Sequence, residues 1–369
     1  MKPRIPMSIP DVSGREEEYL RECISSGWVS SLGRFVERFE ADFSQFCDQQ
    51  FGVSVNSGTA AIHLALRAMG IGPGDEVIVP ALTFASSVNC VLYQGATPVF
   101  IDCQADCWNL DPAELETLIT DRTAAIMPVH LYGKPCDMDA IMEVAARHNI
   151  PVVEDCAEAH GARYRGKPVG SFGVIGCFSF YGNKILTTGE GGMCVTSDAA
   201  LDERLRVLRD HGMNKTRRYW HDDVGYNYRL TNLQAAVGCA QLERVDEFLE
   251  KKRWNAEQYR SRLVDTSLVL PAEAEDTTNV YWLYTVILPE AKTEADRDAL
   301  IEHLDANQIE SRPFFYSLPR MGPYEEYARP LPNSDAMSTR GVTLPSYFAL
   351  TEEDIERVTT SMIDWLEKP

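Results

Sequence analysis

Short apolar runs alternate with amphipathic segments along most of the chain. Runs rich in valine, isoleucine and other apolar residues predict strands at residues 76–79, 98–101, 124–127, 151–153, 176–180 and 193–196. Segments with apolar residues at helical spacing separate several of these runs, as at residues 139–148. In residues 34–46 the phenylalanines repeat on one helical face, which predicts a helix that packs into the core. This alternation is typical of a largely parallel sheet covered by helices.

The pattern changes near residue 250. Thr231 begins a segment with capping-box spacing, which predicts one long helix over residues 231–263, and Ser13 has the same spacing at the first predicted helix. Farther on, a strand is predicted at residues 281–288 and helices at 294–304 and 351–366. We therefore predict a large domain over residues 1–250, including an N-terminal helical segment, and a small C-terminal α+β domain over residues 251–369.

Composition narrows the possible functions. The 369 residues are 44% hydrophobic and 24% charged, which is enough apolar content for two globular domains. The formal net charge of −20, without a basic stripe, argues against non-specific binding of nucleic acid. No apolar run approaches the roughly 20 residues of a membrane helix, and the start of the chain lacks the apolar segment of a secretion signal. The ten cysteines show neither a disulfide framework nor zinc spacing, so we predict a cytoplasmic protein without a metal.

Candidate chemistry centres on one lysine and one aspartate. Lys184 lies among turn-forming and apolar residues with few competing charges, and a lysine withdrawn from water can form a Schiff base and carry protons. Asp155 ends an apolar strand upstream of it. Pyridoxal 5'-phosphate needs a carboxylate at its ring nitrogen and a lysine at its aldehyde. Lys184 and Asp155 are therefore the predicted catalytic residues.

A predicted helix N-terminus supplies the phosphate site. Ser57, Gly58 and Thr59 precede an apolar helical run, and small residues at the start of a helix leave backbone N–H groups open to an anion. These residues, Asp155 and Lys184 follow one another in that order along the chain. Together they predict a site for pyridoxal phosphate.

Several motifs carry a family resemblance. They lie at residues 56–59, 74–80, 130–133, 154–161, 180–192, 225–229 and 311–315. With these motifs the chain resembles the DegT/DnrJ/EryC1/StrS sugar aminotransferases over nearly its whole length. The resemblance implies a fold-type I α/β enzyme, in which a mostly parallel seven-stranded sheet flanked by helices forms the large domain.

The resemblance also implies roles for individual residues. Lys184 would form the imine with the cofactor and Asp155 would contact its pyridine nitrogen. Ser57, Gly58, Thr59 and Ser179 would bind the phosphate, Phe84 would stack on the ring, and Glu158 would lie beside the cofactor. Asn227 would reach the cofactor phosphate of a neighbouring subunit, so the active sites would be shared within a homodimer.

Substrate contacts are predicted at His160, Arg218, Trp220, His221, Arg312 and Phe314. His160 follows the Asp155 turn and either hydrogen-bonds that carboxylate or packs in the interior. Residues 218–221 combine cations with aromatic rings, which suits either a hexose diphosphate or a subunit contact. Arg312 is either an anion ligand or part of a surface ion pair.

The resemblance implies transamination from L-glutamate, with the cofactor cycling between pyridoxal and pyridoxamine phosphate. The implied acceptor is GDP-4-keto-6-deoxy-D-mannose and the product GDP-perosamine, for a surface polysaccharide. Pro319 stands where close relatives have histidine, with Arg320 after it, so a different nucleotide ketosugar remains an alternative. A pyridoxamine-dependent sugar 3-dehydratase would replace Lys184 with histidine, and a non-catalytic regulator would lose Asp155 or Lys184.

Overall fold

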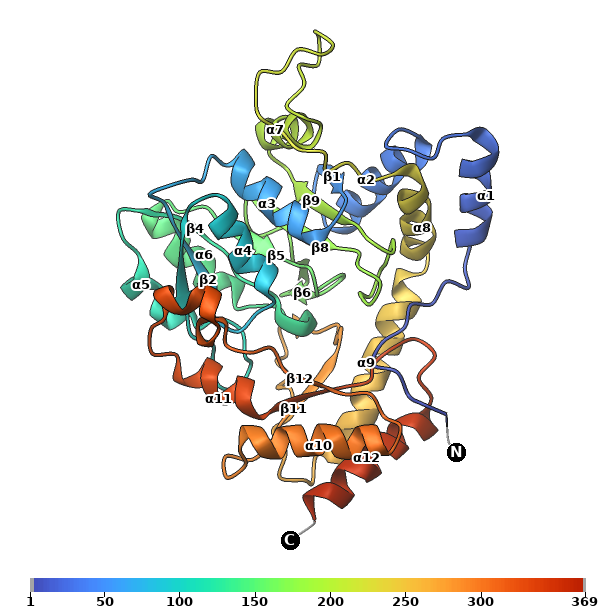
Figure 1. Ribbon diagram of the computed structural model, residues 1–369, viewed down its shortest axis with the longest axis vertical. Helices are drawn as coiled ribbons and strands as arrows, with labels where there is room; N and C mark the ends of the chain where they lie inside the picture. The colour runs from blue at the N-terminus through green and yellow to red at the C-terminus, as the bar shows by residue number, and fades with distance from the viewer. Residues whose placement is uncertain (1–2, 368–369) are drawn as a thin grey trace.

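A seven-stranded sheet forms the centre of the computed structural model, which describes residues 3–367 (Figure 1). Four strands pair in the order β1-β9-β8-β5 and three in the order β3-β2-β4. Parallel bridges from Ile126 to Val152 and from Val129 to Asp155 join β4 to β5. The strands are β1 (Phe51–Val55), β2 (Glu76–Pro80), β3 (Thr97–Ile101), β4 (Thr123–Ile126), β5 (Val153–Asp155), β8 (Ile175–Ser179) and β9 (Gly192–Thr196). Only β9 runs antiparallel to its neighbours, so the predicted mostly parallel sheet is confirmed.

Both faces of this sheet are buried. Side chains alternate along a strand, so Cys177 enters the core on one face and Phe178 the core on the other. Helices cover both faces, and Figure 1 shows α1, α2 and α8 grouped at one side. The helices of this region are α1 (Glu16–Ser26), α2 (Arg34–Phe46), α3 (Gly58–Ala68), α4 (Ala85–Tyr93), α5 (Leu115–Leu118), α6 (Met138–His148), α7 (Ala199–Arg209) and α8 (Asn232–Leu242). Burial on two faces explains the continuous apolar runs of these strands.

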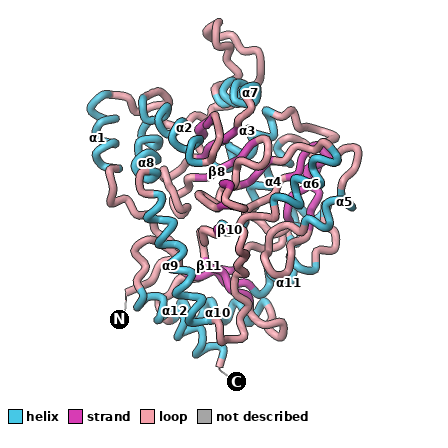
Figure 2. The backbone as a smooth tube through the Cα atoms, turned by 180° about the vertical axis from the view of Figure 1, so that it is seen from behind, coloured by secondary structure: helices cyan, strands magenta, loops and turns pink. Residues whose placement is uncertain are grey.

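A second, smaller layer lies below the sheet in Figures 1 and 2. Its antiparallel sheet has the order β11-β13-β12, and α9, α10 and α12 share an apolar core with it. The elements are α9 (Val245–Leu263), β11 (Tyr284–Ile287), α10 (Glu294–Ala306), β12 (Arg312–Pro313), α11 (Pro332–Arg340), β13 (Gly341–Leu344) and α12 (Glu352–Leu366). Three two-residue strands, β6 (Arg163–Tyr164), β7 (Lys167–Pro168) and β10 (Thr277–Thr278), form a separate small sheet.

The chain crosses between the two layers more than once. Residue 250 lies inside α9, which Figure 2 shows running from the end of α8 into the small layer. Ile5 pairs with Ile309 and belongs to the core of the small layer, whereas Leu318 belongs to the core under the large sheet. Ile5 thus lies in the small layer although it precedes residue 250, and Leu318 lies under the large sheet although it follows residue 250. The boundary at residue 250 remains a prediction.

Two helix predictions need correction. The helix predicted over residues 231–263 is divided into α8 and α9, and Arg244 between them pairs with Asp11. Thr231 does form its capping box. Ser13 forms none, because its hydroxyl donates to Asp11 and α1 begins without a side-chain cap. Within residues 3–367, no helix combines the length and apolar character needed to cross a bilayer.

Candidate active site

The N-terminus of α3 forms the first part of the site. Ser57 caps the helix by accepting a hydrogen bond from the N–H of Ala60 at 3.1 Å. Thr59 shares a 2.8 Å hydrogen bond with Ser86. A Cβ atom on Gly58 would lie 2.5 Å from Cβ of Ser179, so the absence of a side chain lets the end of β8 approach the helix. The helix N-terminus and the hydroxyl groups of Ser57, Thr59 and Ser179 therefore converge where an anion would be stabilised.

Asp155 is the last residue of β5 and is buried. Its carboxylate accepts hydrogen bonds from the Ser87 hydroxyl at 2.7 Å and from the N–H of Ala157 at 3.0 Å. Burial raises the pKa of Asp155, and both hydrogen bonds and the charge of Lys184 oppose that rise. The carboxylate is thus held in one orientation by donors that favour its ionised form.

Lys184 approaches from the turn after β8. Its Nζ lies 3.7 Å from Oε1 of Glu158 and 3.6 Å from the ring centroid of Trp282. Burial lowers the pKa of Lys184, and the charges of Glu158 and Asp155 oppose this shift. Burial also raises the pKa of Glu158 to about 7. The amine therefore loses its proton more readily than a solvated lysine, as an amine that must act as a base requires.

These groups line one cavity of about 410 Å³. Phe84 and Phe315 stand there with ring centroids 5.9 Å apart, and 57% of Phe84 is exposed, so its face is free to stack on a ring. The predicted site residues in the lining are Ser57, Gly58, Thr59, Phe84, Asp155, Glu158, Ser179, Lys184 and Arg312. An anion-binding helix N-terminus, a carboxylate, a largely buried amine and an exposed aromatic face in one cavity fit pyridoxal phosphate. A hollow of about 660 Å³ against α10 and α12 lies apart from all these groups.

Four predicted residues lie outside this cavity. Arg218, Trp220, His221 and Asn227 belong to the segment between α7 and α8, whose tip projects from the body of the molecule (Figure 1). All four are exposed, and Asn227 accepts hydrogen bonds from Arg229. Within one chain, the structure does not bring them to the cofactor residues.

Two other predicted residues are buried in the core. His160 packs against Phe178 and Phe180, and neither of its ring nitrogens has a hydrogen-bond partner among the described residues. Burial lowers the pKa of His160 to about 3, so the packing alternative describes it better than support of Asp155. Phe314 packs against Trp108 and Tyr132. The next residue, Phe315, lines the cavity in its place.

The residues that depart from the expected motif also lie away from the cavity. Pro319 is buried in a short 3-10 helix, and Arg320 pairs with Glu294 at the surface. Sequence reasoning did not identify Trp282, Tyr181, Asn183 or Glu190, which line the cavity. Tyr181, Asn183 and Glu190 stood within the lysine motif, whereas Trp282 comes from a distant strand-like run that resembles ordinary core.

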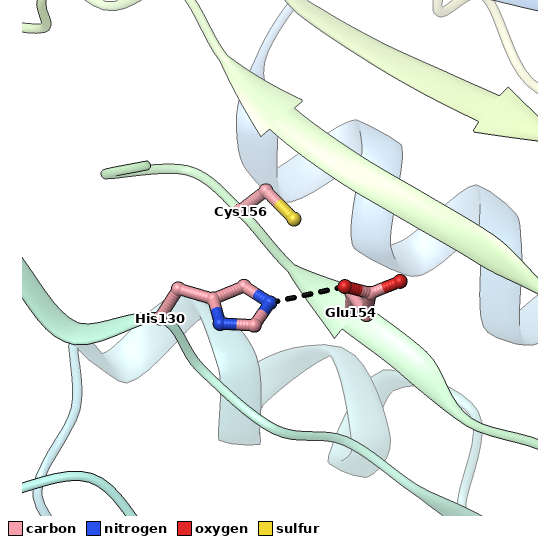
Figure 3. A group of neighbouring side chains, drawn as sticks. All are labelled: His130, Glu154 and Cys156. Carbon is pink, nitrogen blue, oxygen red and sulfur yellow. Dashed lines mark hydrogen bonds and ion pairs between the residues drawn. The ribbon is translucent and has the colours of Figure 1, made fainter. Parts of the chain in front are cut away.

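A second buried cluster, His130, Glu154 and Cys156, could suggest a metal site (Figure 3). His130 Nδ1 accepts from the N–H of Cys136, so Nε2 carries the proton and donates to Glu154 at 3.1 Å. Glu154 also accepts from three backbone N–H groups, at residues 170, 172 and 173. The imidazole and carboxylate are occupied by hydrogen bonds that fix the turn beside β5, which explains the cluster without a metal.

Comparisons with known proteins agree with this geometry. Residues 10–363 match the model of the DegT/DnrJ/EryC1/StrS aminotransferase family. GDP-perosamine synthase of Caulobacter vibrioides is 50% identical over 363 residues, which are 98% of each chain. GDP-perosamine synthase of Escherichia coli O157:H7 is 44% identical over 97% of each chain. The protein Spr1654 of Streptococcus pneumoniae has been solved in PMP and PLP forms. The PMP form is 30% identical, covers 98% of each chain and has a TM-score of 0.93.

Proposed function

Since the chain belongs to the DegT/DnrJ/EryC1/StrS aminotransferase family, we propose that it transfers the amino group of L-glutamate to GDP-4-keto-6-deoxy-D-mannose and forms GDP-perosamine. It is a pyridoxal-phosphate-dependent sugar aminotransferase. The observation that carries the proposal is the convergence of Lys184, Asp155 and the N-terminus of α3 on one cavity. Two GDP-perosamine synthases that match nearly the whole chain support the choice of acceptor.

The bound cofactor supplies an electron sink for the electrons left when the Cα–H bond of the amino donor breaks. Lys184 would hold the cofactor through its amine, and the same amine, when free, would move the Cα proton of the donor. Asp155 would accept a hydrogen bond from the pyridine nitrogen of the cofactor and would keep that nitrogen protonated. The α3 N-terminus, with Ser57, Thr59 and Ser179, would bind the phosphate, and Phe84 would cover the ring.

The electrostatics of the site suit the Lys184 amine both when it accepts a proton and when it carries that proton as an ammonium group. Burial lowers the pKa of Lys184, so a larger fraction of the freed amine is neutral and can accept a proton near pH 7. Glu158, 3.7 Å away, then stabilises the ammonium form. Arg312 lines the cavity with 55% of its side chain exposed, which leaves a cation available to an anionic substrate despite its contact with Glu310.

The acceptor is tested by incubating purified protein with L-glutamate labelled at its amino nitrogen and a panel of GDP-, dTDP- and UDP-linked ketosugars. We expect the label in a 4-amino product from GDP-4-keto-6-deoxy-D-mannose, read by mass. Label in a sugar on another nucleotide alone would contradict the acceptor and favour the alternative of a different ketosugar. Transfer to no sugar would contradict the function. Lys184→Ala is the control without transfer.

We also propose a homodimer with shared active sites. The exposed segment between α7 and α8 supports this, because Asn227 lies outside its own cavity although its motif implies a cofactor contact. Homodimers of Lys184→Ala and of Asn227→Asp should each be nearly inactive. After dissociation and mixing, half the dimers should carry one intact site of two, so activity should recover to about a quarter of wild type. Proven heterodimers without recovery would refute a shared site.

We place the enzyme in the cytoplasm. All ten cysteines are free thiols and all but Cys107 are buried, which suits a reducing compartment.

A further inference from the structure

We propose that Trp282 is a positioning residue for the Lys184 amine, and that Lys252 fixes Trp282 in place from outside the cavity. This inference deepens the proposed function and rests on it. It assigns a task to two residues that the catalytic steps above do not use. Trp282 lines the cavity, whereas Lys252 is on α9 and is not part of the cavity lining.

The indole of Trp282 is held against the lysine at two points. Lys184 Nζ lies 3.6 Å from the ring centroid, within the range in which an aromatic face attracts a cation. The indole Nε1–H donates a 2.7 Å hydrogen bond to the carbonyl of Asn183, the residue before Lys184. The ring therefore contacts both the amine and the backbone that carries it, so a rotation of the ring would break the hydrogen bond.

Lys252 holds the backbone of Trp282. Its buried amine donates to the carbonyl of Trp282 at 2.9 Å and to the carbonyl and hydroxyl of Ser346 at 2.6 and 3.2 Å. No carboxylate pairs with this amine among residues 3–367, and burial lowers the pKa of Lys252 to about 7. An amine buried without a carboxylate is costly, so its three hydrogen bonds are what stabilise it there. They join α9 to the segments before β11 and after β13.

A chain of hydrogen bonds also connects Trp282 with Glu158, the carboxylate that faces the Lys184 amine. The N–H of Trp282 donates to the carbonyl of Tyr132 at 2.9 Å, and the N–H of Tyr132 donates to Oε2 of Glu158 at 2.7 Å. Glu158 in turn faces Lys184. Tyr132 and Tyr281 both have positive φ, at 52° and 48°. Left-handed backbone at non-glycine residues is unfavourable. The surrounding contacts must therefore hold the backbone of Tyr132 and Tyr281 in place where their two segments meet.

These contacts predict how the Lys184 amine titrates. The groups that act on Lys184 are the carboxylates of Glu158 and Asp155 and the face of Trp282, while His160 is buried nearby. The two carboxylates and the indole face favour the ammonium form. Weakening the indole face without changing its shape should therefore lower the pKa of the amine and leave its hydration unchanged.

The test uses cofactor-free protein with fluorinated tryptophan placed at position 282, because fluorine withdraws charge from the ring face at nearly constant shape. The readout is the rate at which acetic anhydride labels Lys184 as a function of pH, followed by peptide mass. We expect the midpoint to fall progressively with fluorination, by about 0.5 to 1.5 pH units at full substitution. A midpoint independent of fluorination would overturn the role of Trp282.

Trp254 provides a matched control. Lys251 lies 3.5 Å from the Trp254 ring centroid on α9, so the pair has similar geometry outside the cavity. Fluorination at position 254 should leave the Lys184 midpoint unchanged. Lys252→Met should shift that midpoint in the same direction as fluorination at 282, since it releases the carbonyl of Trp282. An unchanged midpoint in a folded Lys252→Met protein would refute the part played by Lys252.

Trp282→Phe adds a kinetic readout on the holoenzyme. It keeps a weaker aromatic face but loses the hydrogen bond to Asn183, so kcat should fall while KM for the ketosugar stays within about twofold. A rise in KM with unchanged kcat would mean that Trp282 contacts substrate and does not position the lysine. Failure of the proposed function is distinguishable, because it would appear as absent amino transfer in wild type whatever the Lys184 midpoint.

Discussion

Gly58→Ala tests the proposed phosphate-binding site at the N-terminus of α3. Gly58 is the first residue of α3, and an added Cβ atom would lie 2.5 Å from Cβ and 2.9 Å from Oγ of Ser179. Non-bonded carbon atoms are most stable at about 3.5 Å or more, so Ser179 would have to retreat by about 1 Å. The Ser179 hydroxyl and the N–H groups of α3 could then no longer reach the same phosphate.

Loss of one hydrogen bond to a charged phosphate costs about 1.5–3 kcal/mol. The dissociation constant of pyridoxamine phosphate should therefore rise about 10- to 150-fold in Gly58→Ala. This ligand is chosen because it lacks the aldehyde, so its affinity contains no covalent bond to Lys184. The affinity is measured by titrating cofactor-free protein and following its fluorescence.

Two controls make this test specific. Gly72→Ala adds the same methyl group where the nearest neighbouring atom is 3.9 Å away, so affinity should not change. Pyridoxamine, which lacks the phosphate, should bind Gly58→Ala about as well as wild type. Unchanged affinity for pyridoxamine phosphate in Gly58→Ala would refute phosphate binding at the N-terminus of α3. An equal loss for both ligands would show that the defect lies elsewhere in the cavity.

Two further predictions concern the buried carboxylates. Asp155→Asn removes the charge that, on our proposal, keeps the pyridine nitrogen protonated. The rate of the glutamate half-reaction should therefore fall about 100-fold or more in stopped-flow absorbance, while cofactor content changes little. For Glu158, burial raises the pKa to about 7 from 4.5, so the stability that its protonated form contributes is complete below pH 4.5 and is lost as the pH rises to about 7. In urea unfolding of cofactor-free protein, wild type should lose stability relative to Glu158→Gln across that window by at most about 1.4 kcal/mol per pH unit, and a constant difference would contradict the assignment.

The sequence predicted most of the elements that position the site. The helix at residues 34–46 matches α2, because its phenylalanines share one buried face. Strand β1 was not identified, since its five residues include Gly52 and Ser54 and lack a strong apolar run. The break between α8 and α9 was missed because the leucines and alanines continue a helical pattern across it. The ion pair between Arg244 and Asp11, far apart in sequence, accompanies that break.

Site residues within motifs were easier to predict than those brought in by tertiary contacts. Lys184 and Asp155 meet in one cavity because Asp155 ends β5 and Lys184 follows β8, the neighbouring strand of the same sheet. Phe314 was predicted in place of Phe315. Because β12 ends at Pro313, the alternation of side chains along a strand does not determine which of the next two residues faces the cavity. Trp282 was missed because only the folding of the small layer against the lysine turn brings it to the amine.

Borohydride reduction followed by peptide mapping tests the central claim, that Lys184 carries the cofactor. The holoenzyme should be yellow, and reduction should attach one cofactor to each chain at Lys184. Lys184→Ala should show no adduct at position 184 and should lose turnover by about 100-fold or more. An adduct on another lysine in wild type, such as Lys252 with its lowered pKa, would contradict the assignment of the active site.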